Sequence, residues 1–250
     1  MCTLILMRKV FSAFPLVIAS NRDEDPDRLS ADPGHWQDRL DIYAPRDLVR
    51  GGTWIGTGRY GLFVGITNRD PVPSRYGCAS RGNLVADALA EPSARAARDF
   101  VIRAFASSPF NGFHLAVADA DEAFLLIGDG DRLISSAIPF GATVLTAYGT
   151  KPSHVPRAAE IERRIAALQR RDEASPEALE GLLNFHADGD PRSAACVHDP
   201  RESHRTMSSM VIRADRDWFS FEHWYRRGPA CSGPLIGSVR TVISQERRMP

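Results

Sequence analysis

The chain has 250 residues, of which 43% are hydrophobic, so it is long enough and apolar enough to bury a sizeable core. Its 31 basic and 31 acidic side chains give a formal net charge of zero, which argues against a nucleic-acid partner or an anionic membrane surface. No low-complexity or Gly/Ser-rich linker interrupts residues 1–250, and we therefore expect a single domain.

The beginning of the chain predicts two β-strands. Residues 3–10 and 14–20 are β-branched and apolar, so we expect an antiparallel pair. Arg8 and Lys9 interrupt the apolar run, which is therefore unlike a secretory signal. Because the chain also lacks a run of about 18 apolar residues, we predict no membrane span and expect a soluble, cytoplasmic protein.

The cysteines give no sign of a disulfide framework. They are Cys2, Cys78, Cys196 and Cys231. They are widely separated and form no Cys-x-x-Cys pair, which favours a reducing compartment. A zinc site from Cys196, His198 and His204 would lack the usual fourth ligand and spacing, so we predict no metal site.

The next stretch is read as a loop followed by a hairpin. Residues 25–50 are rich in Asp, Pro and Arg with little periodicity, and we expect a long surface loop. Gly56, Gly58 and Gly61 have the spacing G-x-G-x-x-G. A dinucleotide site needs that motif to open a helix, whereas 62–67 reads as a strand, so we predict a hairpin with a glycine turn.

The middle of the chain predicts helices followed by strands. We expect helices at 83–90 and 94–106, the second capped by Ser93. Strands are expected at 113–118, 123–127 and 132–136. The aspartates between these strands lack the spacing and closing glutamate of a calcium loop, so turn chemistry explains them better.

The remaining elements complete a layered pattern. We expect a strand at 142–147, helices at 156–171 and 176–185, strands at 194–198, 206–213 and 217–223, and an irregular tail from Arg226. Blocks of antiparallel hairpins separated by helical pairs predict an α+β fold. We expect a four-layer αββα sandwich of two mainly antiparallel sheets.

Cys2 is the clearest candidate in the chain for a residue that takes part in a chemical reaction. It becomes the amino-terminal residue when Met1 is removed, and it then carries both a thiol and an α-amine. The thiolate is a nucleophile, and an amine that titrates near about pH 8 can be its general base. The alternative is that Cys2 is a small buried hydrophobe and that 21–24 form a solvated turn.

Five motifs lie in order along the first third of the chain. They are Met1-Cys2, Asn21-Arg22-Asp23-Glu24, Gly51-Gly52-Thr53-Trp54, Gly65-Ile66-Thr67-Asn68-Arg69 and Ser80-Arg81-Gly82-Asn83-Leu84. Together they resemble the NRDE family, also called the transport-and-Golgi-organisation protein 2 family. Ser208-Ser209 is similar to that family's later Ser/Thr pair. The resemblance implies a fold like that of the N-terminal nucleophile hydrolases.

That resemblance also implies roles for individual residues. Cys2 would be the nucleophile and its amine the base, Asp23 would orient the amine, and Asn68 would donate to the oxyanion. Arg22 would be the arginine of the site, although strand alternation turns it to the face opposite Asp23.

The expected substrate contacts are Asn21, Glu24, Trp54 and Arg157. Two positions depart from the hydrolases of this superfamily, because Ser20 stands where they have an arginine and Ala147 where they have an asparagine.

Two functions follow as expectations. The first is an amidohydrolase that cleaves a non-peptide amide of a small molecule and needs no cofactor. The second is a non-catalytic protein that binds and traffics haem or an acyl-CoA or lipid, as members of the resembled family have been linked to such ligands. Its pocket would be lined by His35, Trp36, Arg46, Arg50 and Trp54, although packing explains each of them singly. Either function is compatible with a homodimer.

Overall fold

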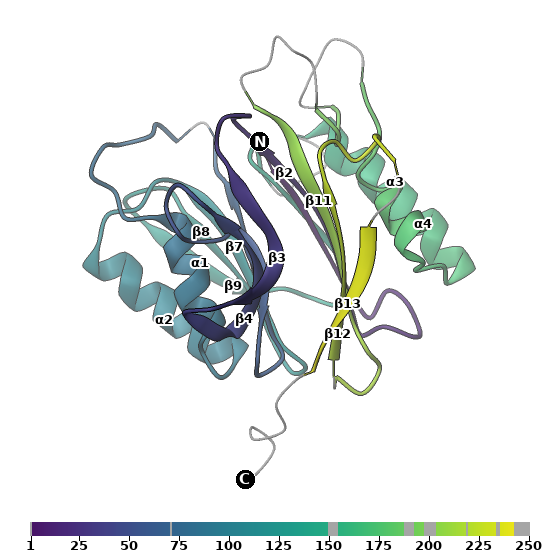
Figure 1. The fold of residues 1–250 in the computed structure, drawn as a ribbon, viewed down its shortest axis with the longest axis horizontal. Helices are drawn as coiled ribbons and strands as arrows, with labels where there is room; N and C mark the ends of the chain where they lie inside the picture. The colour runs from purple at the N-terminus through teal and green to yellow at the C-terminus, as the bar shows by residue number, and fades with distance from the viewer. Residues whose placement is uncertain are drawn as a thin grey trace. The chain divides into compact units, whose positions relative to one another are not determined.

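A computed structural model describes residues 2–70, 72–149, 155–187, 193–197, 204–218, 220–233 and 236–242. The chain divides into two compact units. The first comprises Met1–Asp27, Phe140–Asp217 and Glu222–Arg240, and the second comprises Arg28–Pro139, Trp218–Phe221 and Thr241–Pro250. Each unit is an antiparallel sheet with two helices against it (Figure 1).

The first unit is built on a six-stranded sheet with the order β10-β1-β2-β11-β12-β13. The strands are β1 (Thr3–Arg8), β2 (Leu16–Glu24), β10 (Gly141–Thr146), β11 (Arg205–Ala214), β12 (Ser220–Arg227) and β13 (Ile236–Val242). β1 is antiparallel to both β10 and β2, and β2 is antiparallel to β11. The predicted amino-terminal strand pair is thus confirmed, and it lies inside the sheet rather than at its edge.

Helices α3 (Pro156–Arg171) and α4 (Pro176–Glu180) lie against this sheet (Figure 1). α3 begins at Pro156, where the missing N–H would have no helical partner. Its buried residues recur every three to four positions, as an amphipathic helix requires. They are Ala158, Ile161, Ile165 and Leu168, and they share a core cluster with Ile5, Met7, Val17 and Val211 of the sheet.

The second unit is built on a seven-stranded sheet with the order β3-β4-β5-β6-β7-β8-β9. The strands are β3 (Ser30–Trp36), β4 (Arg39–Asp47), β5 (Ile55–Gly58), β6 (Leu62–Asn68), β7 (Phe113–Ala118), β8 (Ala123–Gly128) and β9 (Leu133–Ala137). Helices α1 (Arg81–Leu89) and α2 (Ala94–Ser107) pack on it. The predicted strands and helices of 55–137 are therefore confirmed to within a few residues.

Local capping explains where these helices and turns form. The hydroxyl of Ser93 accepts a hydrogen bond from the Ala96 amide at the start of α2, as predicted. The Asp119 carboxylate accepts from the amides of Asp121 and Glu122, which is the turn role expected for it.

The glycine-rich stretch serves close packing. A side chain at Gly58 would place its Cβ 2.2 Å from the carbonyl oxygen of Leu89 in α1, and one at Gly52 would lie 2.2 Å from Gly82. Gly61 forms the turn with a φ of 77°. The stretch leads into strand β6, so it is a hairpin and the dinucleotide reading does not apply.

The long loop expected at 25–50 is wrong, because most of it forms the β3–β4 hairpin. Its prolines, Pro33 and Pro45, concealed the pattern. β3 is an edge strand, where proline is tolerated, and the register shifts between Ala31 and Gly34 beside Pro33. Trp36 is buried in the core of the unit, which fixes the hairpin.

Three expectations for the last third also fail. The helix expected at 176–185 ends at Glu180, before Gly181. Residues 194–197 form no strand, because their backbone groups bind elsewhere, for example from the Ala195 amide to the Phe185 carbonyl. The expected irregular tail is wrong up to residue 242, since β12 runs to Arg227 and β13 follows. His198 lies outside the described residues.

Candidate active site

Strand pairing in the first unit brings Cys2 and Asp23 together. Thr3 pairs with Asn21 on the adjacent strand, so Cys2 lies next to the end of β2. The Cys2 Sγ lies 3.7 Å from the backbone oxygen of Asp23. On the far side of β2, Asp23 pairs with Thr206 of β11. β1, β2 and β11 therefore meet where Cys2 and Asp23 lie.

The Asp23 carboxylate is buried between a hydroxyl and a guanidinium. Thr206 donates its hydroxyl hydrogen to Asp23 Oδ1 at 2.6 Å. Arg157 Nη1 lies 3.8 Å from Asp23 Oδ2, and both side chains are fully buried. The same Nη1 donates to the hydroxyl of Thr3 at 3.1 Å. Arg157 therefore connects α3 to the first two strands.

Burial is the largest influence on the protonation of Cys2 and Asp23. Burial raises the pKa of the Asp23 carboxyl, while the amino terminus, Arg157 and the Thr206 hydrogen bond act in the opposite direction. Burial also raises the pKa of the Cys2 thiol, and the nearby carboxylate of Asp23 raises it further. The thiol is therefore neutral at rest and needs a base to become a nucleophile.

Asn21 fixes the surrounding backbone. Its Nδ2 donates to the carbonyls of Leu183 and Ala195 at 2.9 and 2.8 Å, and its Oδ1 accepts from Ser209 at 2.7 Å. Both amide hydrogens are thus used inside the protein, and the side chain is fully buried. The structure replaces the expected substrate contact at Asn21 with a structural one. Ser209 gains a role as its partner.

Arg22 and Glu24 lie on the opposite face of β2 from Asp23, as strand alternation predicts. Arg22 Nη2 is 3.7 Å from Glu24 Oε2. Glu24 Oε1 is 3.7 Å from His204 Nε2. His204 directly precedes β11, so its side chain also reaches this site. Thr3 and Asn21 are the last pair of the antiparallel β1–β2 register. The next position along both strands therefore sets Arg22 across from Cys2.

The two departures noted in the sequence have different structural consequences. Ser20 donates its hydroxyl to the Thr3 carbonyl at 2.9 Å, and Arg157 supplies the buried cation beside Asp23. Thr146 pairs with Thr3, so the residue that follows it, Ala147, comes beside Cys2. Ala147 is buried and offers no side-chain amide there.

Two further expected site residues, Asn68 and Trp54, belong to the second unit. Asn68 ends β6 and is half-buried. Trp54 packs against the core of that unit. Beside Asn68, Thr67 Oγ1 lies 3.4 Å from His114 Nδ1, and burial lowers the pKa of His114 to about 4. The histidine is therefore neutral at physiological pH.

Most of the aromatic and basic residues expected around a ligand are used in packing. Trp36 Nε1 donates to the Ala44 carbonyl at 3.0 Å, and the Arg46 guanidinium stacks 4.4 Å from the Trp36 ring. Arg46 also forms two hydrogen bonds to Asp38. These contacts support the packing reading.

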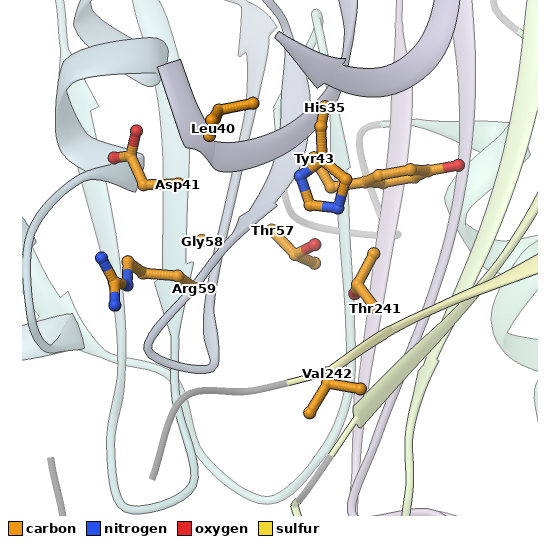
Figure 2. Close-up of a pocket in the computed structure, with 9 residues that line it drawn as sticks. All are labelled: His35, Leu40, Asp41, Tyr43, Thr57, Gly58, Arg59, Thr241 and Val242. Carbon is orange, nitrogen blue, oxygen red and sulfur yellow. The ribbon is translucent and has the colours of Figure 1, made fainter. Parts of the chain in front are cut away.

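His35 does line a pocket of about 250 Å³ in the second unit (Figure 2). Its lining residues are His35, Leu40, Asp41, Tyr43, Thr57, Gly58, Arg59, Thr241 and Val242. Figure 2 shows the imidazole beside the Tyr43 ring, with the ring centroids 5.3 Å apart. This volume is below the roughly 300–1,000 Å³ typical of small-molecule sites.

Solved structures that match this fold include an acid amidase ortholog and a bile acid hydrolase. The Caenorhabditis elegans N-acylethanolamine-hydrolyzing acid amidase ortholog matches with a TM-score of 0.56 and 13% identity over 87% of this chain and 97% of that one. A mutant of conjugated bile acid hydrolase from Clostridium perfringens matches with a TM-score of 0.56 and 9% identity over 99% of this chain and 98% of that one. The fold is therefore the N-terminal nucleophile hydrolase-like α+β sandwich, as predicted.

Sequence comparison gives the family. Residues 1–227 match the family described as Transport and Golgi organisation 2, and the chain belongs to that family. The Transport and Golgi organization protein 2 homolog of Bos taurus is 23% identical over 240 residues, which cover 82% of this chain and 84% of that protein. Among the described residues, no helix has the length and apolar character needed to cross a membrane.

Proposed function

We propose that this protein is a cysteine amidohydrolase that cleaves a non-peptide amide bond of a small molecule. The observation that carries the proposal is the Cys2 thiol, which lies 3.7 Å from the backbone oxygen of Asp23, a residue whose fully buried carboxylate is held by Thr206 and Arg157. A buried charged group with dedicated partners next to a potential nucleophile is typical of a catalytic site. The hydrolase names of the structural neighbours support the same class of reaction.

Removal of Met1 would start the chemistry. The freed α-amine of Cys2 takes the thiol proton, and the thiolate attacks the substrate carbonyl carbon. The ammonium then returns the proton to the leaving amine as the C–N bond breaks, which leaves a thioester on Cys2. Water, deprotonated by the same amine, hydrolyses the thioester and regenerates the thiol. A base is required because burial raises the pKa of this thiol.

The remaining site residues are assigned by position. Asp23 would orient the amine, and Arg157 would lower the pKa of that carboxyl against the opposing effect of burial. Arg22 and Glu24 are left as the polar residues for substrate contact.

Three measurements on the purified protein test the proposal. Intact mass should show loss of Met1, iodoacetamide should label Cys2 ahead of Cys78, and a panel of small amides should reveal a hydrolysed substrate. Cys2→Ala should abolish that turnover, and Cys78→Ala should leave it unchanged. A chain that retains Met1 and shows no amide turnover would overturn the proposal.

A second candidate is a binding and trafficking protein for haem or an acyl-CoA or lipid. The observation that favours it is Ala147, which lies beside Cys2 without the amide that would stabilise an oxyanion. Haem binding would shift the Soret band, and acyl-CoA binding would release or absorb heat in calorimetry. No Soret shift and no binding heat would remove this candidate.

A further inference from the structure

Three potential metal ligands, His186, Cys196 and Cys231, meet in the first unit. They come from the segment after α4, the segment 193–197 and the turn after β12, so they are remote in sequence. Their ligand atoms all lie within 4.8 Å of one another. The two Sγ atoms are 3.8 Å apart.

That sulfur–sulfur distance fits a shared tetrahedral ion. Two thiolates that each lie about 2.3 Å from zinc, at the tetrahedral angle, are about 3.8 Å apart. A disulfide would require about 2.05 Å. The corresponding sulfur–nitrogen distance is about 3.6 Å, and the His186 ring nitrogen lies within 4.8 Å of both sulfurs.

We propose that His186, Cys196 and Cys231 bind a Zn²⁺ ion. Thiolate and imidazole ligands select zinc or another soft transition metal over Ca²⁺ and Mg²⁺, which prefer oxygen. With three ligands from the described residues, one position of the tetrahedron is left for water or a further side chain. This site differs from the trio suggested by sequence spacing, in which only Cys196 is shared.

The ion would stabilise the backbone of residues 193–197, which contacts the candidate active site. Ala195 accepts from Asn21, and the Val197 amide donates to the Thr206 hydroxyl at 2.9 Å. That hydroxyl in turn binds Asp23. Cys196 lies between these two residues in sequence and its side chain is in the core, so a metal bound there would add a third fixed point to the segment. The inference does not depend on the proposed hydrolase activity.

The test is metal content in the full chain after expression with zinc and removal of loosely bound ions. Wild type and the control Cys78→Ser should each hold one zinc ion per chain by elemental mass spectrometry. Cys231→Ser and His186→Ala alter exposed side chains, so both should fold, and both should weaken zinc binding by more than about 100-fold. This exceeds the 10–100-fold cost of losing an outer partner.

Cobalt substitution provides a second readout of the ligands. Wild type and Cys78→Ser should show thiolate-to-cobalt charge-transfer absorption with tetrahedral ligand-field bands, and Cys231→Ser should lose much of that absorption. Wild-type protein without stoichiometric zinc would overturn the proposal, as would zinc that all these variants retain. An intact mass lower by two hydrogens, lost only in the Cys196 or Cys231 variants, would assign a disulfide and also overturn it.

Discussion

The guanidinium of Arg157 lies 3.8 Å from the carboxylate of Asp23, and neither side chain is exposed. A buried ion pair is expensive to desolvate, and it persists only where both charges are satisfied. Thr3 accepts a hydrogen bond from Arg157, and Thr206 donates one to Asp23. The arrangement therefore fixes α3, β1, β2 and β11 relative to one another at the position of Cys2.

Arg157→Met should strongly destabilise the protein, because it leaves the Asp23 carboxylate buried without its cation. Removing one partner of a buried pair typically costs about 3–5 kcal/mol. Urea unfolding followed by circular dichroism measures this. Arg163→Met is the matched control, since Arg163 pairs with Glu160 on the exposed side of the same helix and should change stability little. Equal losses in the two variants would contradict the role given to Arg157.

Ionisation of Asp23 should contribute to the pH dependence of the free energy of unfolding. Because burial raises the pKa of this carboxyl above its ordinary value of 3.8, the folded protein keeps a proton that the unfolded chain has lost. Its contribution to stability is therefore greatest in acid and falls as the pH rises from about 4 through the raised pKa. Asp23→Asn should remove that fall when unfolding free energies are compared across this range.

Glu160 provides the control of opposite sign. Hydrogen bonds from Arg163 and Arg164 lower the pKa of Glu160 to about 2, so its contribution is present above its ordinary pKa and is lost as the pH falls toward 2. Glu160→Gln should therefore alter only the acid limb. If Asp23→Asn altered the same limb instead, the raised pKa of Asp23 would be wrong.

Asn21→Ala should destabilise the protein by more than a typical polar substitution. It leaves the carbonyls of Leu183 and Ala195 and the hydroxyl of Ser209 without their partner, and each buried unsatisfied group costs about 1–3 kcal/mol. Hydrogen exchange should rise at 194–197 in particular. Asn83→Ala, on the exposed face of α1, is the control and should leave both measurements nearly unchanged.

Sequence reasoning found the groups that carry a recognisable pattern. Cys2, the Asn21–Glu24 motif and the periodic helix of 156–171 could be predicted because each is encoded by neighbouring residues. The partners of Asp23 could not, because Thr206 reaches it only through strand pairing and Arg157 only through helix docking. The position of Arg157 directly after a helix-opening proline was visible, but its inward direction was not.

The same limit explains the failures in the fold. The β3–β4 hairpin was hidden by Pro33 and Pro45. Pro33 is tolerated because of an edge position and a register shift that only the assembled sheet defines. The approach of Cys196 to Cys231 likewise depends on tertiary packing, and no local spacing encodes it.

Gly58→Ala should test whether the glycine-rich stretch serves packing. The added Cβ would lie 2.2 Å from the Leu89 carbonyl, so α1 or the strand must shift, at a cost of about 1–3 kcal/mol or more. Gly34→Ala is the matched control, because no atom lies within 4 Å of its added Cβ. Thermal unfolding should show a lower midpoint for Gly58→Ala alone. A similar drop in both variants would point to a general glycine effect.

Ala147→Asn should increase amide turnover if the proposed hydrolase activity is limited by oxyanion stabilisation. The Thr3–Thr146 register sets residue 147 beside Cys2, where an amide could donate to the developing oxyanion. Loss of one such donor costs about 10²–10³-fold in rate where it has been measured, so kcat should rise by up to that factor while KM changes less. Ala147→Leu, which has a similar volume but no donor, is the control for the buried site. If the two variants have equal kcat and equal thermal midpoints, the side-chain amide at this position contributes nothing to turnover.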